Sequence, residues 1–189
     1  MMSKKMYTAS VFPDRESMLK YKLFAAAFSY PDEAFFKTFP DLKNQADNII
    51  AEYDRLFRAG ELWLYATEYL ANNEFEKSNY LSDISGFYKA FGVEPDRERP
   101  DLLTNELEFM HLLIFKIFYA QQGTGIKQNN NAIVCLNALM TFFNEYLYAP
   151  AKKISVAVLS QSQHDFYKIM AQELIEFMEY QNESFGKNI

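Results

Sequence analysis

The chain has 189 residues, a length that suits one compact domain with a sizeable core. Hydrophobic residues make up 49% of it and aromatic residues 17%, which excludes a disordered chain. The formal net charge of -6 repels phosphate backbones and anionic lipid head groups, so the composition argues against nucleic-acid and membrane-surface roles and favours a basic partner peptide.

The first part of the chain predicts two helices separated by proline. Asp14 can cap a first helix that ends before Tyr30, because the apolar residues after it follow the three-four spacing of one buried face. These apolar residues are Met18, Leu19, Leu23, Phe24 and Phe28. Pro31, which two acidic residues follow, fits the first turn of a short second helix that stops by Pro40.

The middle of the chain predicts further helices that glycine and asparagine punctuate. A third helix is expected over residues 41–58, with Gly60 as a left-handed stop. Residues 61–90 predict one or two helices with a break near Asn72-Asn73. A polar loop is expected over residues 93–100, after Gly92.

The clearest helical pattern covers residues 101–122. Apolar residues repeat there at alternating spacings of four and three, which predicts a central helix that several others contact. They are Leu103, Leu107, Met110, Ile114 and Ile117. After a loop over 123–131, another helix is expected to end at Pro150, and Ser160 with Gln163 fits a capping box for a last helix.

No segment alternates apolar and polar residues for long, as a strand would. The predicted fold is therefore all-α: one domain over residues 1–189, a bundle of roughly eight to nine helices, with 1–13 flexible. The N-terminal residues lack the apolar stretch of a secretory signal, and Lys116 interrupts the apolar run before it well short of a membrane span. These features predict a cytoplasmic protein.

Candidate chemistry is sparse. Glu108 and His111 have the Glu-x-x-His spacing of bundle di-iron sites, but the second histidine, His164, has Gln161 at the matching offset. The first spacing leaves a metal-dependent helical-bundle enzyme as one alternative, although the second histidine does not complete the motif. Cys135 lies in an apolar run, and the sequence contains neither a phosphate loop nor a nucleophile elbow. The residues thus predict a protein that is not an enzyme and needs no cofactor or metal.

Three motifs follow one another between residues 87 and 110. They are Phe87-Tyr88-Lys89-Ala90-Phe91-Gly92, then Glu98-Arg99-Pro100-Asp101-Leu102-Leu103, then Glu106-Leu107-Glu108-Phe109-Met110. Two flanking segments, 52–57 and 164–167, extend the pattern over nearly the whole chain. In this order, the motifs resemble the signature region of the TorD/DmsD (NarJ-like) family of molybdoenzyme maturation chaperones. Leu102 stands where that family usually has histidine, and the family's Pro-rich segment is missing after Arg58.

The resemblance implies a chaperone that binds the apo catalytic subunit of a molybdopterin oxidoreductase, in some cases through its twin-arginine signal peptide, until the cofactor is inserted. A signal peptide has a basic start and an apolar middle, so an acidic rim beside an apolar groove would complement it. The partner-binding residues carried over by motif match are Tyr88, Gly92, Glu98, Pro100, Asp101, Glu106 and Glu108. A generic helical adaptor is a further alternative. The client's identity, nucleotide binding, and the choice between monomer and homodimer stay open.

Overall fold

The computed structural model describes residues 12–94, 99–122 and 126–186. Most of the segment 1–13, predicted to be flexible, and the predicted site residue Glu98 therefore lie outside the described residues. Within these ranges every regular element is helical, and one isolated antiparallel β-bridge joins Tyr65 to Leu102. The predicted all-α fold class is confirmed.

The first elements follow the predicted order. The third helix, predicted over residues 41–58, consists of three helical segments of different types. A 3-10 turn, an α-helix and a π-helical turn follow one another over this stretch. The elements are α1 (Arg15–Ala27), α2 (Glu33–Thr38), η2 (Pro40–Gln45), α3 (Ala46–Tyr53) and η3 (Asp54–Arg58).

The remaining elements include the longest helices. They are α4 (Thr67–Leu70), α5 (Glu74–Ala90), α6 (Leu103–Gln121), α7 (Ile126–Phe142), η4 (Phe143–Leu147), α8 (Tyr148–Gln161) and α9 (Asp165–Gly186). The break predicted near residues 72–73 is confirmed, because the side chain of Asn73 caps α5 by accepting a hydrogen bond from the backbone N–H of Glu76 at 2.9 Å.

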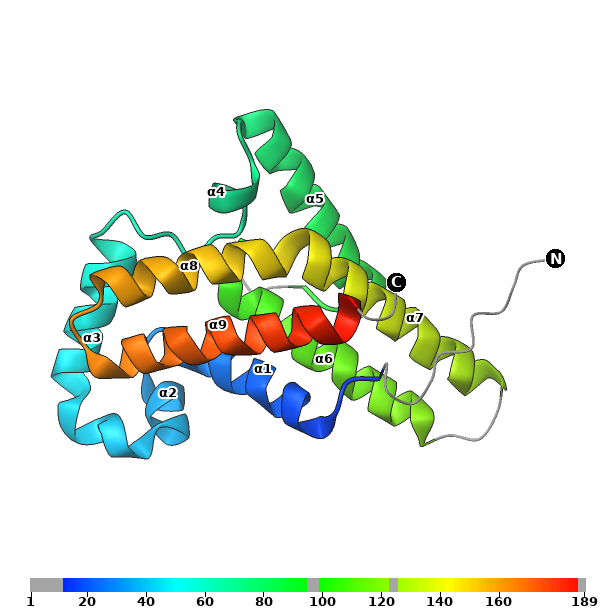
Figure 1. The fold of residues 1–189 in the computed structure, drawn as a ribbon, viewed down its shortest axis with the longest axis horizontal. Helices are drawn as coiled ribbons and strands as arrows, with labels where there is room; N and C mark the ends of the chain where they lie inside the picture. The colour runs from blue at the N-terminus through cyan, green and yellow to red at the C-terminus, as the bar shows by residue number, and fades with distance from the viewer. Residues whose placement is uncertain (1–11, 95–98, 123–125, 187–189) are drawn as a thin grey trace.

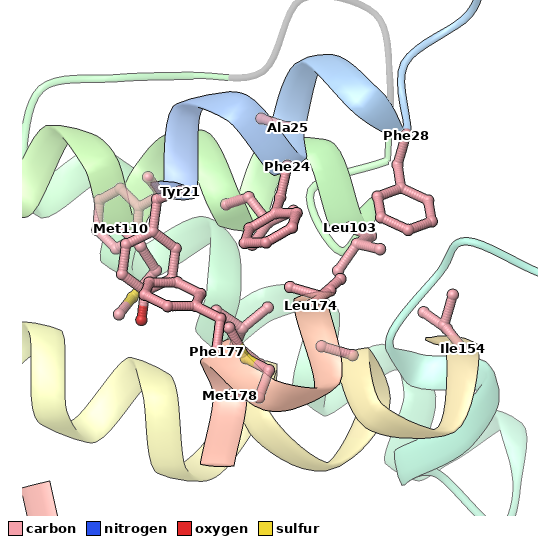
Figure 2. Close-up of a cluster of buried hydrophobic side chains, with 14 of the residues drawn as sticks. Tyr21, Phe24, Ala25, Phe28, Leu103, Met110, Ile154, Leu174, Phe177 and Met178 are labelled. Carbon is pink, nitrogen blue, oxygen red and sulfur yellow. The ribbon is translucent and has the colours of Figure 1, made fainter. Parts of the chain in front are cut away.

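Helix α6 lies at the centre of the bundle. It packs most extensively on α1 and α7, while α8 and α9 form an antiparallel pair beside α1 (Figure 1). Its predicted apolar seam is confirmed, since all five residues are completely buried. The core continues between α1 and α9, where the Phe177 ring lies 4.8 Å from that of Tyr21 and 5.6 Å from that of Phe24 (Figure 2).

Pro150 does not end a helix, contrary to the prediction. The run from α7 through η4 to α8 is continuous, and Pro150 occupies the first turn of α8, directly after the π-helical turn. The wider π-helical turn shifts the backbone pairing just before Pro150, so a proline, which has no N–H to donate, fits there without ending the helix. The run Asn130–Gln161 is long and apolar enough to cross a membrane by length and composition alone. In the most apolar 18-residue window of this run, 44% is buried inside the bundle. Helices of a protein core meet the same criteria of length and composition, so the run is only weak evidence for a membrane span.

Three predicted helix starts are corrected by the structure. The first is that of α7, which begins at Ile126, inside the loop predicted over 123–131. Asp14 caps α1 as predicted, but Pro31 lies before Asp32, which is the cap of α2, and not in its first turn. Ser160 is still part of α8 and donates to the carbonyl oxygen of Ala157, so the predicted capping box is wrong. The last helix begins instead after His164, whose Nδ1 accepts a hydrogen bond from the backbone N–H of Phe166.

Two further side-chain and backbone predictions are also wrong. Leu19 is 55% exposed, because it lies on the outer side of α1. Gly92, and not Gly60, has the left-handed backbone among the described glycines. Gly60 is needed for a different reason: a Cβ there would lie 2.8 Å from the carbonyl oxygen of Leu56. That distance is shorter than a carbon can tolerate.

Candidate functional site

A groove of about 390 Å³ lies between the C-terminal end of α5 and the outer face of α6. We call it the α5–α6 groove. Its apolar lining consists of Tyr88, Val93, Phe109 and Leu112, and its polar lining of Glu94, Asn105, Glu108 and His111. Two of the predicted site residues, Tyr88 and Glu108, therefore line one cavity.

The apolar floor of the groove is held by aromatic packing and one hydrogen bond. The Tyr88 ring meets that of Phe109 edge to face at 4.8 Å, and the Tyr88 hydroxyl donates to the carbonyl oxygen of Pro100 at 2.7 Å. Pro100, a predicted site residue, therefore acts through its backbone, by fixing Tyr88. The edge-to-face contact and the hydrogen bond both stabilise this position of the Tyr88 ring.

Gly92 turns the chain from α5 toward the groove. Its φ of 74° ends the helix, and the N–H of Val93 reaches back to the carbonyl oxygen of Tyr88 at 3.0 Å. This turn brings Val93 and Glu94 to the rim of the groove. The predicted site residue Gly92 thus shapes the groove through its backbone.

The polar edge of the groove belongs to α6 and contacts α1. Glu108 forms an ion pair with Lys22 at 2.6 Å, with both side chains about half exposed to solvent. His111 Nδ1 lies 2.9 Å from the carbonyl oxygen of Met18. A carbonyl oxygen can only accept, so Nδ1 carries the proton and donates it. Both side chains therefore fasten α1 to α6 beside the groove.

Asp101 does not form part of an exposed acidic rim, contrary to the prediction. It is completely buried, and its carboxylate accepts hydrogen bonds from the N–H and hydroxyl of Thr67 and from the guanidinium of Arg99. Two backbone hydrogen bonds join the same segments. The N–H of Leu103 donates to the carbonyl oxygen of Leu64, and the N–H of Ala66 donates to the carbonyl oxygen of Asp101, both at 2.8 Å. Asp101 therefore joins the segment before α4 to the start of α6.

Glu106 is also completely buried, and neither of its carboxylate oxygens has a hydrogen-bond partner among the described residues. Burial, and then the charge of Asp101, raise the pKa of Glu106 well above its usual value. Both effects disfavour the charged form of this carboxyl. Because the start of α6 is covered by the segment at residues 62–67, Asp101 and Glu106 point inward. The expectation that they line an acidic rim is wrong.

The Glu108–His111 pair is not arranged to bind a metal. Oε1 of Glu108 is paired with Lys22, and Nδ1 of His111 faces the Met18 carbonyl. The described parts of the chain contain no group of three or more histidine, cysteine or acidic side chains that could hold an ion. The second histidine, His164, lies at the start of α9 and caps it. The geometry therefore does not support the metal-dependent alternative.

Sequence reasoning missed several residues that line the groove. Asn105 and Leu112 lie three and four residues from Glu108, and Phe109 lies four residues from Asn105 and three from Leu112, which are the offsets of one helix turn. That spacing was visible in the sequence. Val93 and Glu94 join the groove only through the turn at Gly92, which no periodic pattern reveals.

Comparison with known proteins identifies a family. A family model described as "Nitrate reductase delta subunit" matches residues 25–151, which is more than half of the chain. The matched region contains α5, α6 and every residue that lines the α5–α6 groove. No curated protein and no solved structure gives a significant match to the chain.

Proposed function

The chain belongs to the nitrate reductase delta subunit family of NarJ-like molybdoenzyme maturation chaperones, and on this premise we propose that it binds the apo catalytic subunit of a molybdopterin oxidoreductase. The chaperone holds this subunit, through a basic and apolar segment such as a signal peptide, while the cofactor is inserted. It acts in the cytoplasm, before the client is assembled or exported.

The α5–α6 groove is the observation that supports this proposal. Its floor presents the apolar surfaces of Tyr88, Phe109 and Leu112, and two carboxylates, Glu94 and Glu108, border it. An apolar peptide segment buries its side chains in such a groove, and acids at the rim attract basic residues that flank it. The net charge of -6 adds a long-range attraction for the same ligand.

The chemistry of the groove supports a binding role and not a catalytic one. Among the described residues, its lining contains no serine, threonine, cysteine or lysine that could act as a nucleophile. The imidazole of His111 donates to a backbone carbonyl, and Glu108 is paired with Lys22. These titratable groups therefore serve the packing of α1 on α6, and we propose that the client enzyme alone performs the redox chemistry.

Co-purification of the tagged chain from its native cells would test the proposal. The expected partner is a molybdopterin-binding catalytic subunit, free of cofactor. A partner from another class of protein would contradict the proposal. A synthetic peptide with the sequence of that subunit's N-terminal segment would then be used to measure the binding affinity by calorimetry.

Two matched substitutions would test the groove itself. Leu112→Glu puts a charge on the apolar floor and should weaken peptide binding at least tenfold, because burying an unpaired charge costs more than about 1.4 kcal/mol. Val156→Glu is the control: Val156 is exposed on α8 and does not line the groove. Equal affinity of the Leu112→Glu variant and the wild type would remove the α5–α6 groove from the mechanism.

A further inference from the structure

A second hollow, of about 550 Å³, lies on another face of α5, against the π-helical turn η4. We call it the α5–η4 trough. One wall consists of small residues of α5 and the floor of aromatic rings. The residues are Ser82, Asp83, Gly86, Phe87, Ala90, Phe91 and Tyr146. The rings of Phe87 and Tyr146 meet edge to face at 5.6 Å, which keeps the floor rigid.

Gly86 has no role in the packing of this chain. It is exposed in the middle of α5, and a Cβ added there would meet no atom within 4 Å. A glycine inside a helix is less favourable than alanine. With Ser82 and Ala90 one turn away on either side, it keeps the wall of the trough open to close approach by another chain.

Two carboxylates give the trough a negative charge. Asp83 lines it, and Glu145 precedes Tyr146 in η4. Neither forms an ion pair with any basic residue that the structure describes. Burial, followed by the charges of Glu145 and Asp83, raises the pKa of Tyr146 to about 12. The field of both acids therefore reaches the aromatic floor. Aromatic faces beside carboxylates are a favourable environment for a cation.

A contact between two aromatic rings links the trough to the α5–α6 groove. Phe91 lines the trough, and its ring lies 5.8 Å from that of Phe109, which lines the groove. The two hollows thus flank the C-terminal end of α5. A single peptide segment that rounds this end contacts both.

We propose that the α5–η4 trough binds a basic side chain of the client segment whose apolar residues occupy the α5–α6 groove. The cation lies over the rings of Phe87 and Tyr146 and pairs with Asp83, while the client backbone approaches Gly86. This inference rests on the proposed function, because it takes the client as the partner. It assigns the basic and the apolar parts of one segment to two different hollows.

NMR titration of the 15N-labelled full chain would test the trough without the client. The probe is a synthetic alanine and leucine peptide with one arginine, and its matched control carries citrulline, a neutral isostere of arginine. The amide signals of Gly86 and Ala90 should shift saturably with the arginine peptide. Binding of the citrulline peptide should be about tenfold weaker, since it lacks the charge for the cation–π contact. Equal shifts with both peptides would overturn the proposal.

Two variants separate this proposal from the proposed function. Gly86→Leu fills the trough without disturbing the fold and should abolish the shift at Ala90. Leu112→Glu changes only the α5–α6 groove and should keep the shift at Ala90. If the client binds the Gly86→Leu variant as tightly as the wild type, the trough proposal fails and the proposed function stands. If no molybdoenzyme subunit binds either form but the arginine peptide still shifts Gly86 selectively, the proposed function fails and the cation site stands.

A second copy of the chain is the competing occupant of the trough. Sedimentation of the wild type and of Gly86→Leu over a range of concentrations distinguishes it. A dimer that Gly86→Leu dissociates would overturn the proposal. A monomer in both cases supports a partner of another sequence, in agreement with the acidic charge that two copies would bring together.

Discussion

The carboxylate of Glu52 in α3 accepts a hydrogen bond from the hydroxyl of Ser162 at 2.8 Å. The same oxygen accepts the backbone N–H of Gln163 at 2.6 Å, while Arg55 pairs with Glu52 and donates to the carbonyl oxygen of Gln161 at 2.7 Å. The backbone N–H of His164 also donates to Glu52 at 3.3 Å, so two segments that resemble chaperone sequences, 52–57 and 164–167, meet at the turn between α8 and α9. Their shared role in this fold is structural.

Glu52→Gln should destabilise the protein at pH 7 by about 2–3 kcal/mol, because a buried, multiply bonded charge is lost. Burial raises the pKa of Glu52, but hydrogen bonds from Arg55, Gln163 and Ser162 outweigh it and lower the pKa to about 2. A lowered pKa gives stability that is present above the unfolded value of 4.5 and is lost as the pH falls toward about 2.

Urea unfolding between pH 7 and pH 3 would measure this contribution. The wild type should lose stability more steeply than Glu52→Gln as the pH falls, so that the two curves converge. Glu173→Gln, at an exposed position on α9, is the control and should leave the curve unchanged. Parallel curves for Glu52→Gln and the wild type would contradict the assignment.

Asp101→Ala should destabilise the whole domain by roughly 3–5 kcal/mol, because Arg99 and the hydroxyl of Thr67 lose their buried acceptor. Circular dichroism during chemical denaturation would show one cooperative transition at a lower denaturant concentration than that of the wild type. Thr67→Val removes the hydrogen bond that the hydroxyl donates to Asp101 and the one that it accepts from Arg99, and it should cost about 1–2 kcal/mol. A fully stable Asp101→Ala protein that no longer binds peptide would instead make Asp101 a direct contact.

Glu106→Met should stabilise the protein, and more so as the pH rises. The folded pKa of Glu106 is raised above the unfolded value, so its contribution is fully present below pH 4.5 and declines as the pH rises. An apolar side chain of similar length avoids that loss, and we expect a gain of about 1 kcal/mol or more at pH 8.

Thermal unfolding at pH 5 and pH 8 would test the Glu106 prediction. The difference in melting temperature between the variant and the wild type should be larger at pH 8. Glu108→Met replaces a half-exposed carboxylate and should show no such growth. A Glu106→Met variant that is less stable than the wild type at pH 8 would indicate a partner for this carboxylate.

Substitution of two glycines in neighbouring parts of the chain should have opposite effects. Gly86→Ala should stabilise α5 by about 1 kcal/mol, because alanine favours a helix and meets open space there. Gly92→Ala should destabilise by about 1 kcal/mol, because its φ of 74° is strained for any residue with a Cβ. In urea unfolding, the midpoint should rise for Gly86→Ala and fall for Gly92→Ala relative to the wild type. A loss of stability in Gly86→Ala would mean that α5 depends on this glycine.

Much of the fold could be predicted because helical periodicity is a local property. The seam from Leu103 to Ile117 and the cap at Asn73 each depend on residues within a few positions. Pro150 was misread because proline is compatible with both a helix end and a first turn. Only the π-helical turn before it distinguishes the two.

The candidate site was predicted less completely than the fold. Tyr88 and Glu108 line the α5–α6 groove, and Gly92 and Pro100 shape it through their backbones. The acids Asp101 and Glu106 were expected on the rim but are buried. A charged residue near a helix start is usually solvated, so the sequence favoured the wrong environment for both.

The sequence by itself determined that the chain folds into helices, where α1, α5 and α6 begin, and which motifs resemble a chaperone family. The tertiary structure decided which side chains meet water. The physical reason is that the periodicity of a helix is set by its own backbone. Burial of Asp101, in contrast, depends on Thr67, which reaches it only because the chain folds back between them. Such contacts between distant segments leave no periodic signal in one sequence.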